Sequence, residues 1–177
     1  ACSCFTKNGS VFAYLNGGVL VKERAIIYEC GSNCKCPLSC RNRLTQRGMK
    51  YRLEVFKTED RGWGLRSWDS IPAGSFICEY TGKLIENTQA LRSRDYLLDT
   101  SRLPQNIPQW GDASNLLSTR TSQIKDFAPR PDILIDSSQT GNVSRFINHS
   151  CSPNVFSQCV AWNHYDSKHP HIMLFAM

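Results

Sequence analysis

The sequence predicts a mainly β protein with a small zinc-thiolate module at its amino end. Two observations lead to this fold class. Short strand-like runs, separated by turn residues, follow one another from about residue 52 onward. Four cysteines lie within eleven residues, and two more stand near the first residue. A chain of 177 residues has room for one domain with a hydrophobic core and one small module.

The cysteines have the spacing C-x3-C-x-C-x3-C, preceded upstream by C-x-C: Cys2, Cys4, Cys30, Cys34, Cys36 and Cys40. Two cysteines one residue apart do not readily form a disulfide with each other, whereas both can point at a metal ion. Tetrahedral zinc gathers thiolates from tight loops with bonds of about 2.3 Å. We therefore favour a zinc-thiolate knot over a disulfide framework, and a reducing compartment with it.

Charge and hydropathy limit the function classes. Residues 1–66 hold 12 Lys and Arg against 5 Asp and Glu, whereas residues 67–112 have a net charge of −2. A basic segment can contact nucleic acid; the alternative, which we favour, is that metal-bound thiolates offset its charge. No apolar run approaches the roughly 20 residues of a membrane span, and the amino end shows no signal segment. We expect an intracellular protein with no membrane segment.

The first elements are expected as follows. Residues 5–29 have the composition of a loop that ends in the apolar run AIIY. Residues 52–58 alternate as a strand does, and EDRGWG then supplies a turn. Residues 75–85, SFICEYTGKLI, form a β-rich run after the turn IPAG.

The later elements include one insertion. Residues 87–99 have a more helical pattern, and residues 100–131 are rich in Ser, Thr, Pro and Gln, which is typical of a long, weakly ordered insertion. Residues 132–136, DILID, resume β structure. The turn QTGN then leads into a short helical segment, VSRFINHS, and the runs VFSQCVAW and HIMLFAM are expected as strands.

Three stretches taken together point to a known family: RGWGLRS (61–67), ICEYTGKLI (77–85) and GNVSRFINHSCSPN (141–154). They resemble a SET domain of the suppressor-of-variegation class of histone lysine methyltransferases, and the cysteine run resembles that class's pre-SET zinc module. The amino-acid sequence of residues 40–74 resembles that of members of the plant branch. The resemblance implies a β-clip fold, with a partial pre-SET module at 1–48 and a SET domain at 49–177 that carries an insertion at about 87–131.

The resemblance also implies site residues. S-adenosylmethionine (AdoMet) would lie against the RGWG loop, the RFINHSC segment and one tyrosine: Arg61, Gly62, Trp63, Tyr96, Arg145, Asn148 and His149. Glycines beside Trp63 would let the backbone approach the ligand. Tyr80 resembles the tyrosine that lines the channel for the substrate lysine. The alternatives are a turn with a core tryptophan at Trp63 and ordinary core tyrosines at Tyr80 and Tyr96.

The metal ligands follow from the same resemblance. The family's pre-SET module uses nine cysteines to hold three zinc ions, and six of those positions are present, so we expect fewer than three zinc ions here. Cys151 resembles a cysteine that joins three post-SET cysteines around a further zinc, the alternative being a buried thiol. Cys78 and Cys159 stand in apolar runs and are expected in the core.

The expected function is that of an AdoMet-dependent histone lysine methyltransferase core. The resemblance implies histone H3 lysine nine as substrate, the H3 tail and nucleosome as partners, chromatin silencing in the nucleus, and methylated DNA bound through an upstream domain. The family's essential tyrosine motif, of the type E-L-T-Y-D-Y, does not occur in these 177 residues. Both ends look cut, and we expect the isolated piece to have little activity. Alternatives are a catalytically silent chromatin adaptor with the same fold and, more weakly, a purely structural zinc module.

Overall fold

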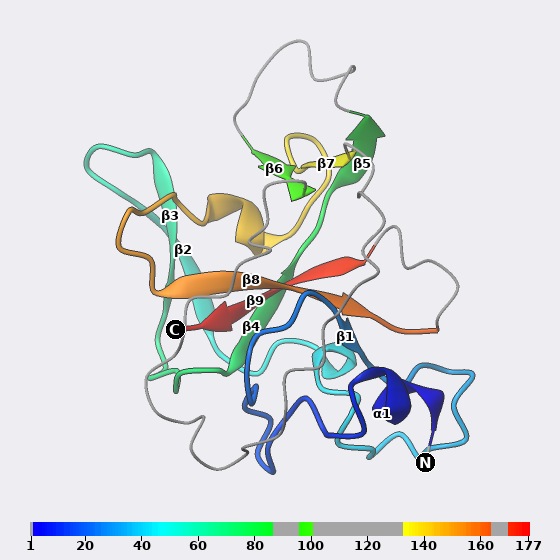
Figure 1. Cartoon of the computed structure of the whole chain (residues 1–177). Coiled ribbons are helices and arrows are strands. Elements are labelled where there is room, and N and C mark those ends of the chain that lie inside the picture. The colour runs from blue at the N-terminus through cyan, green and yellow to red at the C-terminus, as the bar shows by residue number, and fades with distance from the viewer. Residues whose placement is uncertain (1, 87–95, 101–132, 164–169) are drawn as a thin grey trace.

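The computed structural model describes residues 2–86, 96–100, 133–163 and 170–177. Short strands dominate it, as the sequence predicts (Figure 1). The helical elements are α1 (Ser3–Lys7) and the 3-10 turns η1 (Thr45–Arg47) and η5 (Val143–Phe146). The strands are β1 (Ile27–Tyr28), β2 (Leu53–Lys57), β3 (Trp63–Ser67), β4 (Phe76–Tyr80), β5 (Lys83–Glu86), β6 (Leu97–Asp99), β7 (Ile133–Asp136), β8 (Val155–Ala161) and β9 (His171–Ala176).

A four-stranded sheet in the order β1-β8-β9-β4 holds the centre of the molecule (Figure 1). Strand β1 runs parallel to β8, and the other pairs are antiparallel. Phe175 of β9 is fully buried, and its ring lies 5.7 Å from those of Phe76 and Phe156 and 6.5 Å from that of Tyr14. Tyr14 comes from the amino-terminal module, so one apolar cluster joins the module to the sheet. Burying each such side chain contributes roughly 1.5–3 kcal/mol.

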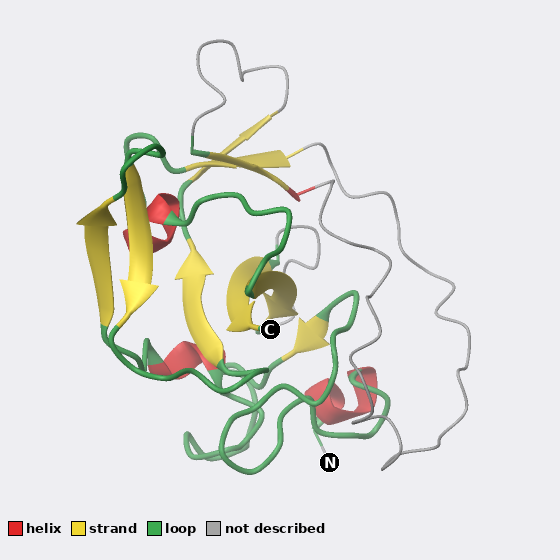
Figure 2. Ribbon diagram, turned by 90° about the vertical axis from the view of Figure 1, so that its left-hand side faces the viewer, coloured by secondary structure: helices red, strands yellow, loops and turns green. Residues whose placement is uncertain are grey.

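Two smaller sheets flank the central one (Figure 2). Strands β2 and β3 form an antiparallel hairpin that pairs Leu53 with Ser67 and Lys57 with Trp63. Strands β5, β7 and β6 form the third sheet, with β7 in the middle. The 3-10 turn η5 packs against β2, β3 and β4, and so places the RFINHSC segment between the hairpin and the central sheet.

Several expected elements are confirmed. Strands β2, β7, β8 and β9 fall within the runs that the sequence marks as strands. The run AIIY contains β1. Cys78 and Cys159 are buried, with exposed fractions of 0% and 4%, and burial raises the pKa of the Cys78 thiol to about 12, which fits an inert core residue.

Other expectations need correction. The run at 75–85 is two strands in different sheets, because the chain turns at Thr81 and Gly82 between β4 and β5. The turn expected across EDRGWG ends at Gly62, since β3 already begins at Trp63. The helix α1 was not expected, because five residues are too few for a periodic pattern.

The helical expectations are the least accurate. Of the expected helical run at 87–99, residues 87–95 lie outside the described residues; Leu97 and Leu98 belong to strand β6, because β7 offers them an edge to pair with. The helical turn in VSRFINHS ends at Phe146, so Asn148 and His149 follow it in irregular backbone. The expected insertion at 100–131 lies, apart from residue 100, outside the described residues. No helix in the described part of the chain has the length and apolar character needed to cross a bilayer.

Candidate functional site

Six cysteine sulfurs gather beside α1. The Sγ atoms of Cys2 and Cys30 are 3.3 Å apart, as are those of Cys4 and Cys34. The Sγ atom of Cys30 also lies 4.0 Å from those of Cys36 and Cys40. None of the chain's nine cysteines forms a disulfide. The structure therefore brings together the six cysteines that the sequence assigns to the amino-terminal zinc module, whereas the seventh predicted ligand, Cys151, lies elsewhere.

The donor set fits zinc. Tetrahedral zinc with sulfur bonds of about 2.3 Å places its ligand sulfurs about 3.8 Å apart, close to the separations observed. Five of the six sulfurs form two groups that could each hold a metal ion, and Cys30 belongs to both: Cys2, Cys4 and Cys30, and Cys30, Cys36 and Cys40. A thiolate at Cys30 would thus bridge two metals. Cys34 belongs to neither group, although its Sγ atom lies 3.3 Å from that of Cys4. Burial, with the hydrogen bond and charge of Cys34, raises the pKa of free Cys4 to about 12, so a metal bound there would displace a proton.

Buried polar side chains hold the cluster's loops in place. Asn42, which is 2% exposed, donates from Nδ2 to the carbonyl oxygen of Tyr28 at 2.8 Å and to the Sγ atom of Cys30 at 3.6 Å. Arg43 donates from Nη2 to the carbonyl oxygen of Cys36 at 3.2 Å. The sequence analysis did not identify Asn42 and Arg43 as functional residues. The sequence indicated them only by their position just after Cys40, in CRNR.

Glu29, beside the cluster, is fully buried and saturated with hydrogen bonds. Its carboxylate accepts from Tyr14 Oη at 2.7 Å, from the Thr45 backbone N–H at 2.9 Å and from Gln46 Nε2 at 2.7 Å. A buried charge needs such partners, since an unpaired one would cost several kcal/mol. Burial, followed by the charge of Glu29, raises the pKa of Tyr14 well above its ordinary value, so Tyr14 stays a donor. These hydrogen bonds join Glu29, which precedes the cysteine run, to Thr45 and Gln46, which follow it.

The second candidate site joins two segments more than 80 residues apart. Arg61 donates from Nη1 to the carbonyl oxygen of His149 at 3.0 Å, and Asn148 donates from Nδ2 to the carbonyl oxygen of Trp63 at 3.0 Å. The two bonds run in opposite directions and tie the RGWG loop to the RFINHSC segment. All four residues are exposed. The sequence motifs thus converge as predicted, although Asn148 and His149 do so from a loop and not from a helix.

The RGWG loop presents an open aromatic face. The indole of Trp63 is 50% exposed, so it is not the core tryptophan of the alternative interpretation. Gly62 has a φ of 68°, in the left-handed region that glycine adopts without strain, and open space surrounds it. Gly64 is different: a Cβ there would lie 3.0 Å from the ring of Phe56, so this glycine makes room for a neighbouring side chain and not for a ligand.

A third group of predicted residues meets beside β4. Tyr80 donates from Oη to the carbonyl oxygen of Tyr96 at 3.2 Å. The guanidinium of Arg145 lies 4.6 Å from the Tyr96 ring centroid and donates from Nη2 to the carbonyl oxygen of Ser138 at 2.8 Å. Tyr96 has a φ of 66°, which is uncommon for a residue with a side chain and marks a position held by its surroundings. Because Arg145 and Asn148 are three residues apart, this group adjoins the RGWG contacts.

Asn142 orients the whole segment and was missed by sequence reasoning. Its Oδ1 accepts from the backbone N–H of Ser144 at 3.0 Å, which caps η5, while its Nδ2 donates to the carbonyl oxygen of Glu79 at 2.8 Å. One side chain therefore fixes the RFINHSC segment to β4, next to Tyr80. An Asn before a helical turn is a known N-cap signal, and the turn QTGN contained it.

Cys151 lies apart from the amino-terminal cluster. Its Sγ atom is 3.8 Å from His149 Nε2, and the thiol is exposed in this chain. Within the described residues Cys151 belongs to neither of the two groups that could hold a metal ion. Its role as a ligand stays a prediction.

Comparison with known proteins agrees with this architecture. The SET domain model matches residues 62–177, and the Pre-SET motif model matches residues 1–43. The chain therefore belongs to the SET-domain family, in the form that carries a pre-SET module. Its relatives include plant SUVH proteins that match over 99% of the chain, which confirms the predicted class and branch. Among them is Arabidopsis thaliana SUVH3, named an H3 lysine-9 specific histone-lysine N-methyltransferase, with 47% identity over 99% of this chain.

Solved structures show the same fold. Arabidopsis thaliana SUVH6 in complex with SAM matches 99% of this chain and 36% of its own, with 43% identity and a TM-score of 0.80. KRYPTONITE in complex with mCHH DNA, an H3(1-15) peptide and SAH matches 99% of this chain and 31% of its own, with 36% identity and a TM-score of 0.76. The chain spans about a quarter of the length of the curated relatives, 27% for SUVH3.

Proposed function

We propose that this chain is the catalytic core of an AdoMet-dependent histone lysine methyltransferase that acts on lysine nine of histone H3. The observation that carries the proposal is the pair of opposed hydrogen bonds that joins the RGWG loop to Asn148 and His149 beside an exposed indole. Relatives named for H3 lysine-9 and structures solved with SAM or with an H3 peptide support it. The proposed module boundaries are residues 1–48 and 49–177.

The chain's own residues divide the work of binding. Trp63 offers a flat apolar wall, and the backbone of Gly62 can approach a ligand closely. Arg61, Asn148 and His149 hold that wall in place and leave polar atoms beside it. When bound here, AdoMet supplies an electrophilic methyl group on a positively charged sulfur.

Tyr80 is assigned to the channel for the substrate lysine, whereas Tyr96 and Arg145 are assigned to the AdoMet side together with the residues of the RGWG and RFINHSC segments. The Tyr80 hydroxyl is fixed by its bond to the Tyr96 carbonyl, so it can orient an incoming amine. The amine must be neutral when it attacks, because an ammonium group has no lone pair. Alignment of the reacting atoms to about 3–3.5 Å, away from water, would supply much of the rate.

Zinc would have a structural role. The six clustered cysteines would hold it, with Cys30 shared, and the bound metal would fix the module against the central sheet through β1. Cys151 would take part in a further zinc site completed by cysteines outside this chain. The metal is remote from Trp63 and Tyr80 in the sequence and shares no residue with them, so we assign it no chemical step.

The place of action would be chromatin in the nucleus, with the H3 tail of a nucleosome as substrate and a silencing role. In the whole protein, methylated DNA would be bound through an upstream domain, since the chain covers only part of its relatives' length. The rival is a silent adaptor, which would keep the fold but not the affinity for AdoMet.

Two measurements test the proposal. The first is a calorimetric titration of AdoMet into the 177-residue chain, where saturable binding that is lost in Trp63→Ala supports the cofactor site. The second is methyl transfer by the longest product of the gene to an H3 peptide, compared with the same peptide carrying arginine in place of lysine nine. If neither the 177-residue chain nor the longest product of the gene binds AdoMet, the silent adaptor is the better description.

A further inference from the structure

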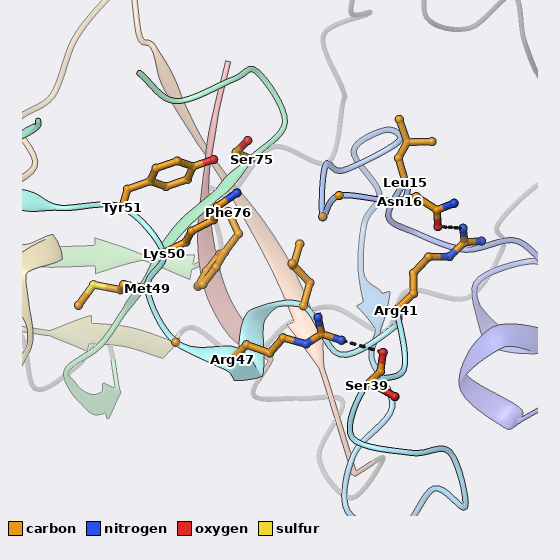
Figure 3. A pocket seen from close by; sticks show the side chains of 14 residues that line it. Leu15, Asn16, Ser39, Arg41, Arg47, Met49, Lys50, Tyr51, Ser75 and Phe76 are labelled. Atoms are coloured by element: carbon orange, nitrogen blue, oxygen red, sulfur yellow. Dashed lines mark hydrogen bonds between the residues drawn. The ribbon is translucent and has the colours of Figure 1, made fainter. Parts of the chain in front are cut away.

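A hollow of about 600 Å³ lies between the cysteine module and the central sheet, and none of the proposed AdoMet or lysine residues lines it. Its walls come from the loop at residues 15–18, from residues 39–51 and from the start of β4 (Figure 3). A volume of this size lies within the range of known ligand sites. We call it the basic hollow, because its charged lining residues are Arg41, Arg47 and Lys50, with no Asp or Glu among the fourteen.

The cationic groups are held in place without being neutralised. Arg41 donates from Nη1 to Asn16 Oδ1 at 2.7 Å, and its guanidinium lies 3.7 Å from the ring centroid of Phe12. Arg47 donates from Nη2 to the carbonyl oxygens of Ser39 at 3.0 Å and Cys40 at 2.8 Å. Figure 3 shows the bonds from Arg41 to Asn16 and from Arg47 to Ser39. Neither guanidinium forms an ion pair with a carboxylate in the described part of the chain. Binding an anion would therefore cost little side-chain entropy.

The rim is also apolar. Leu15 and Met49 are exposed to 53% and 54%, and Leu44 and Phe76 lie behind them. The loop that carries Leu15 packs closely against Leu44, because a Cβ on Gly18 would come within 2.7 Å of Leu44 Cδ1. Exposed aliphatic side chains beside arginines are typical of the centre of protein interfaces. A nucleic-acid backbone would use the charges but leave the apolar groups uncovered.

We propose that the basic hollow binds an acidic peptide segment that carries one apolar anchor side chain. The acidic groups lie along Arg41, Arg47 and Lys50, and the anchor covers Met49, because Figure 3 shows Leu15 on the opposite side of the hollow. The proposal concerns a surface distinct from the AdoMet region and does not depend on methyl transfer.

The test uses the zinc-loaded 177-residue chain and a fluorescent nine-residue peptide of Asp and Glu with a central phenylalanine. Comparison probes are the same peptide with a central alanine, a lysine-based peptide and a short DNA duplex. Fluorescence anisotropy should show saturable binding of the acidic phenylalanine peptide, weaker binding of the alanine peptide and none of the lysine peptide.

The variants separate charge from apolar contact. Arg41→Glu with Lys50→Glu should weaken binding by roughly tenfold or more at low salt, and the matched control Lys83→Glu, on β5, by less than about twofold. Arg47 is left unchanged because it bonds the Cys40 carbonyl next to a predicted metal ligand. Met49→Gln should weaken the phenylalanine peptide about fivefold and the alanine peptide hardly at all.

Zinc content and thermal melting of each variant show whether the module is intact. The proposal is overturned by absence of peptide binding, by tighter binding of the DNA duplex with the same dependence on Arg41 and Lys50, or by an equal effect of Met49→Gln on both acidic peptides. If the variant with Arg41→Glu and Lys50→Glu loses zinc, its peptide affinity is not used. The proposal is then judged by Met49→Gln alone, because Met49 lies outside the cysteine loops.

Discussion

The cysteine module and the AdoMet region are built in opposite ways. In the module the functional side chains are supported from within: Cys30 and Glu29 are fully buried, and Asn42 bonds both backbone and sulfur. In the AdoMet region the corresponding groups are exposed, and two hydrogen bonds between loops hold them together. The module is therefore suited to a permanently bound metal, whereas the proposed AdoMet region is open, as a ligand that binds and leaves would require.

This difference also separates stability from affinity. Changes inside the module should lower the free energy of unfolding, because they leave buried groups unpaired. Changes in the AdoMet region should lower affinity with little effect on stability, because solvent replaces what is lost. The predictions below test this separation, starting with the largest effect.

The largest effect is expected for Cys30→Ser, which removes the sulfur shared by both metal groups. Both metals should be lost, with a fall of about 4–5 kcal/mol or more in the free energy of unfolding. Elemental analysis and guanidinium unfolding would measure the two quantities. The control is Cys151→Ser, which lies outside these groups and should leave the zinc of the amino-terminal module unchanged. Full zinc content in Cys30→Ser would contradict a shared ligand.

Asn42→Leu should come next, with a loss of about 1–2 kcal/mol, because the Tyr28 carbonyl would lose one of its two side-chain donors and keep only Asn8 Nδ2 at 2.9 Å. The shared sulfur would also lose its hydrogen bond, so zinc should transfer faster to a chelator. The matched control is Asn33→Leu, in the exposed part of the same cysteine run, which should change stability by less than about 0.5 kcal/mol. Equal effects of the two variants would show that the buried amide is unimportant.

Trp63→Ala is expected to act on affinity. Removing the exposed indole should weaken AdoMet binding about tenfold, since an aromatic wall contributes roughly this much, and should hardly change the melting temperature. Trp68→Ala is the control, because Trp68 is also exposed, at 65%, and directly follows β3. A large fall in stability without a fall in AdoMet affinity would show that Trp63 supports the fold and not the ligand site.

Asn148→Ala should give the smallest effect, a loss of about threefold to fivefold in AdoMet affinity. It removes the bond to the Trp63 carbonyl but leaves the bond from Arg61 to His149 in place. The same calorimetric titration measures it, with Asn154→Ala, another exposed asparagine of the same segment, as control. An unchanged affinity would mean that the second bond alone holds the two loops together.

Much of the fold was predictable because strands leave a local signature. The runs around β2, β7, β8 and β9 carry alternating or continuous apolar residues between turn residues, and each became a strand. Strand β6 was not predictable from Leu97 and Leu98 alone, since only pairing with β7 selects the extended form there. The helical expectation for Asn148 and His149 was wrong for a similar reason: η5 ends at Phe146, and the two residues after it bond to Trp63 and Arg61 instead of continuing the helical turn.

The sequence by itself determined the chemistry that is available: cysteines at metal-binding spacing, and the motifs RGWG and RFINHSC that identify the family. Tertiary structure alone decided that the Cys30 sulfur stands in both groups that could hold a metal ion, that Asn42 and Glu29 support this part of the chain, and that Arg61 and Asn148 tie two distant segments together. The physical reason is the separation along the chain of the residues in contact. Spacing along the chain governs contacts between near neighbours, whereas hydrogen bonds between residues more than 80 positions apart exist only once the strands have paired.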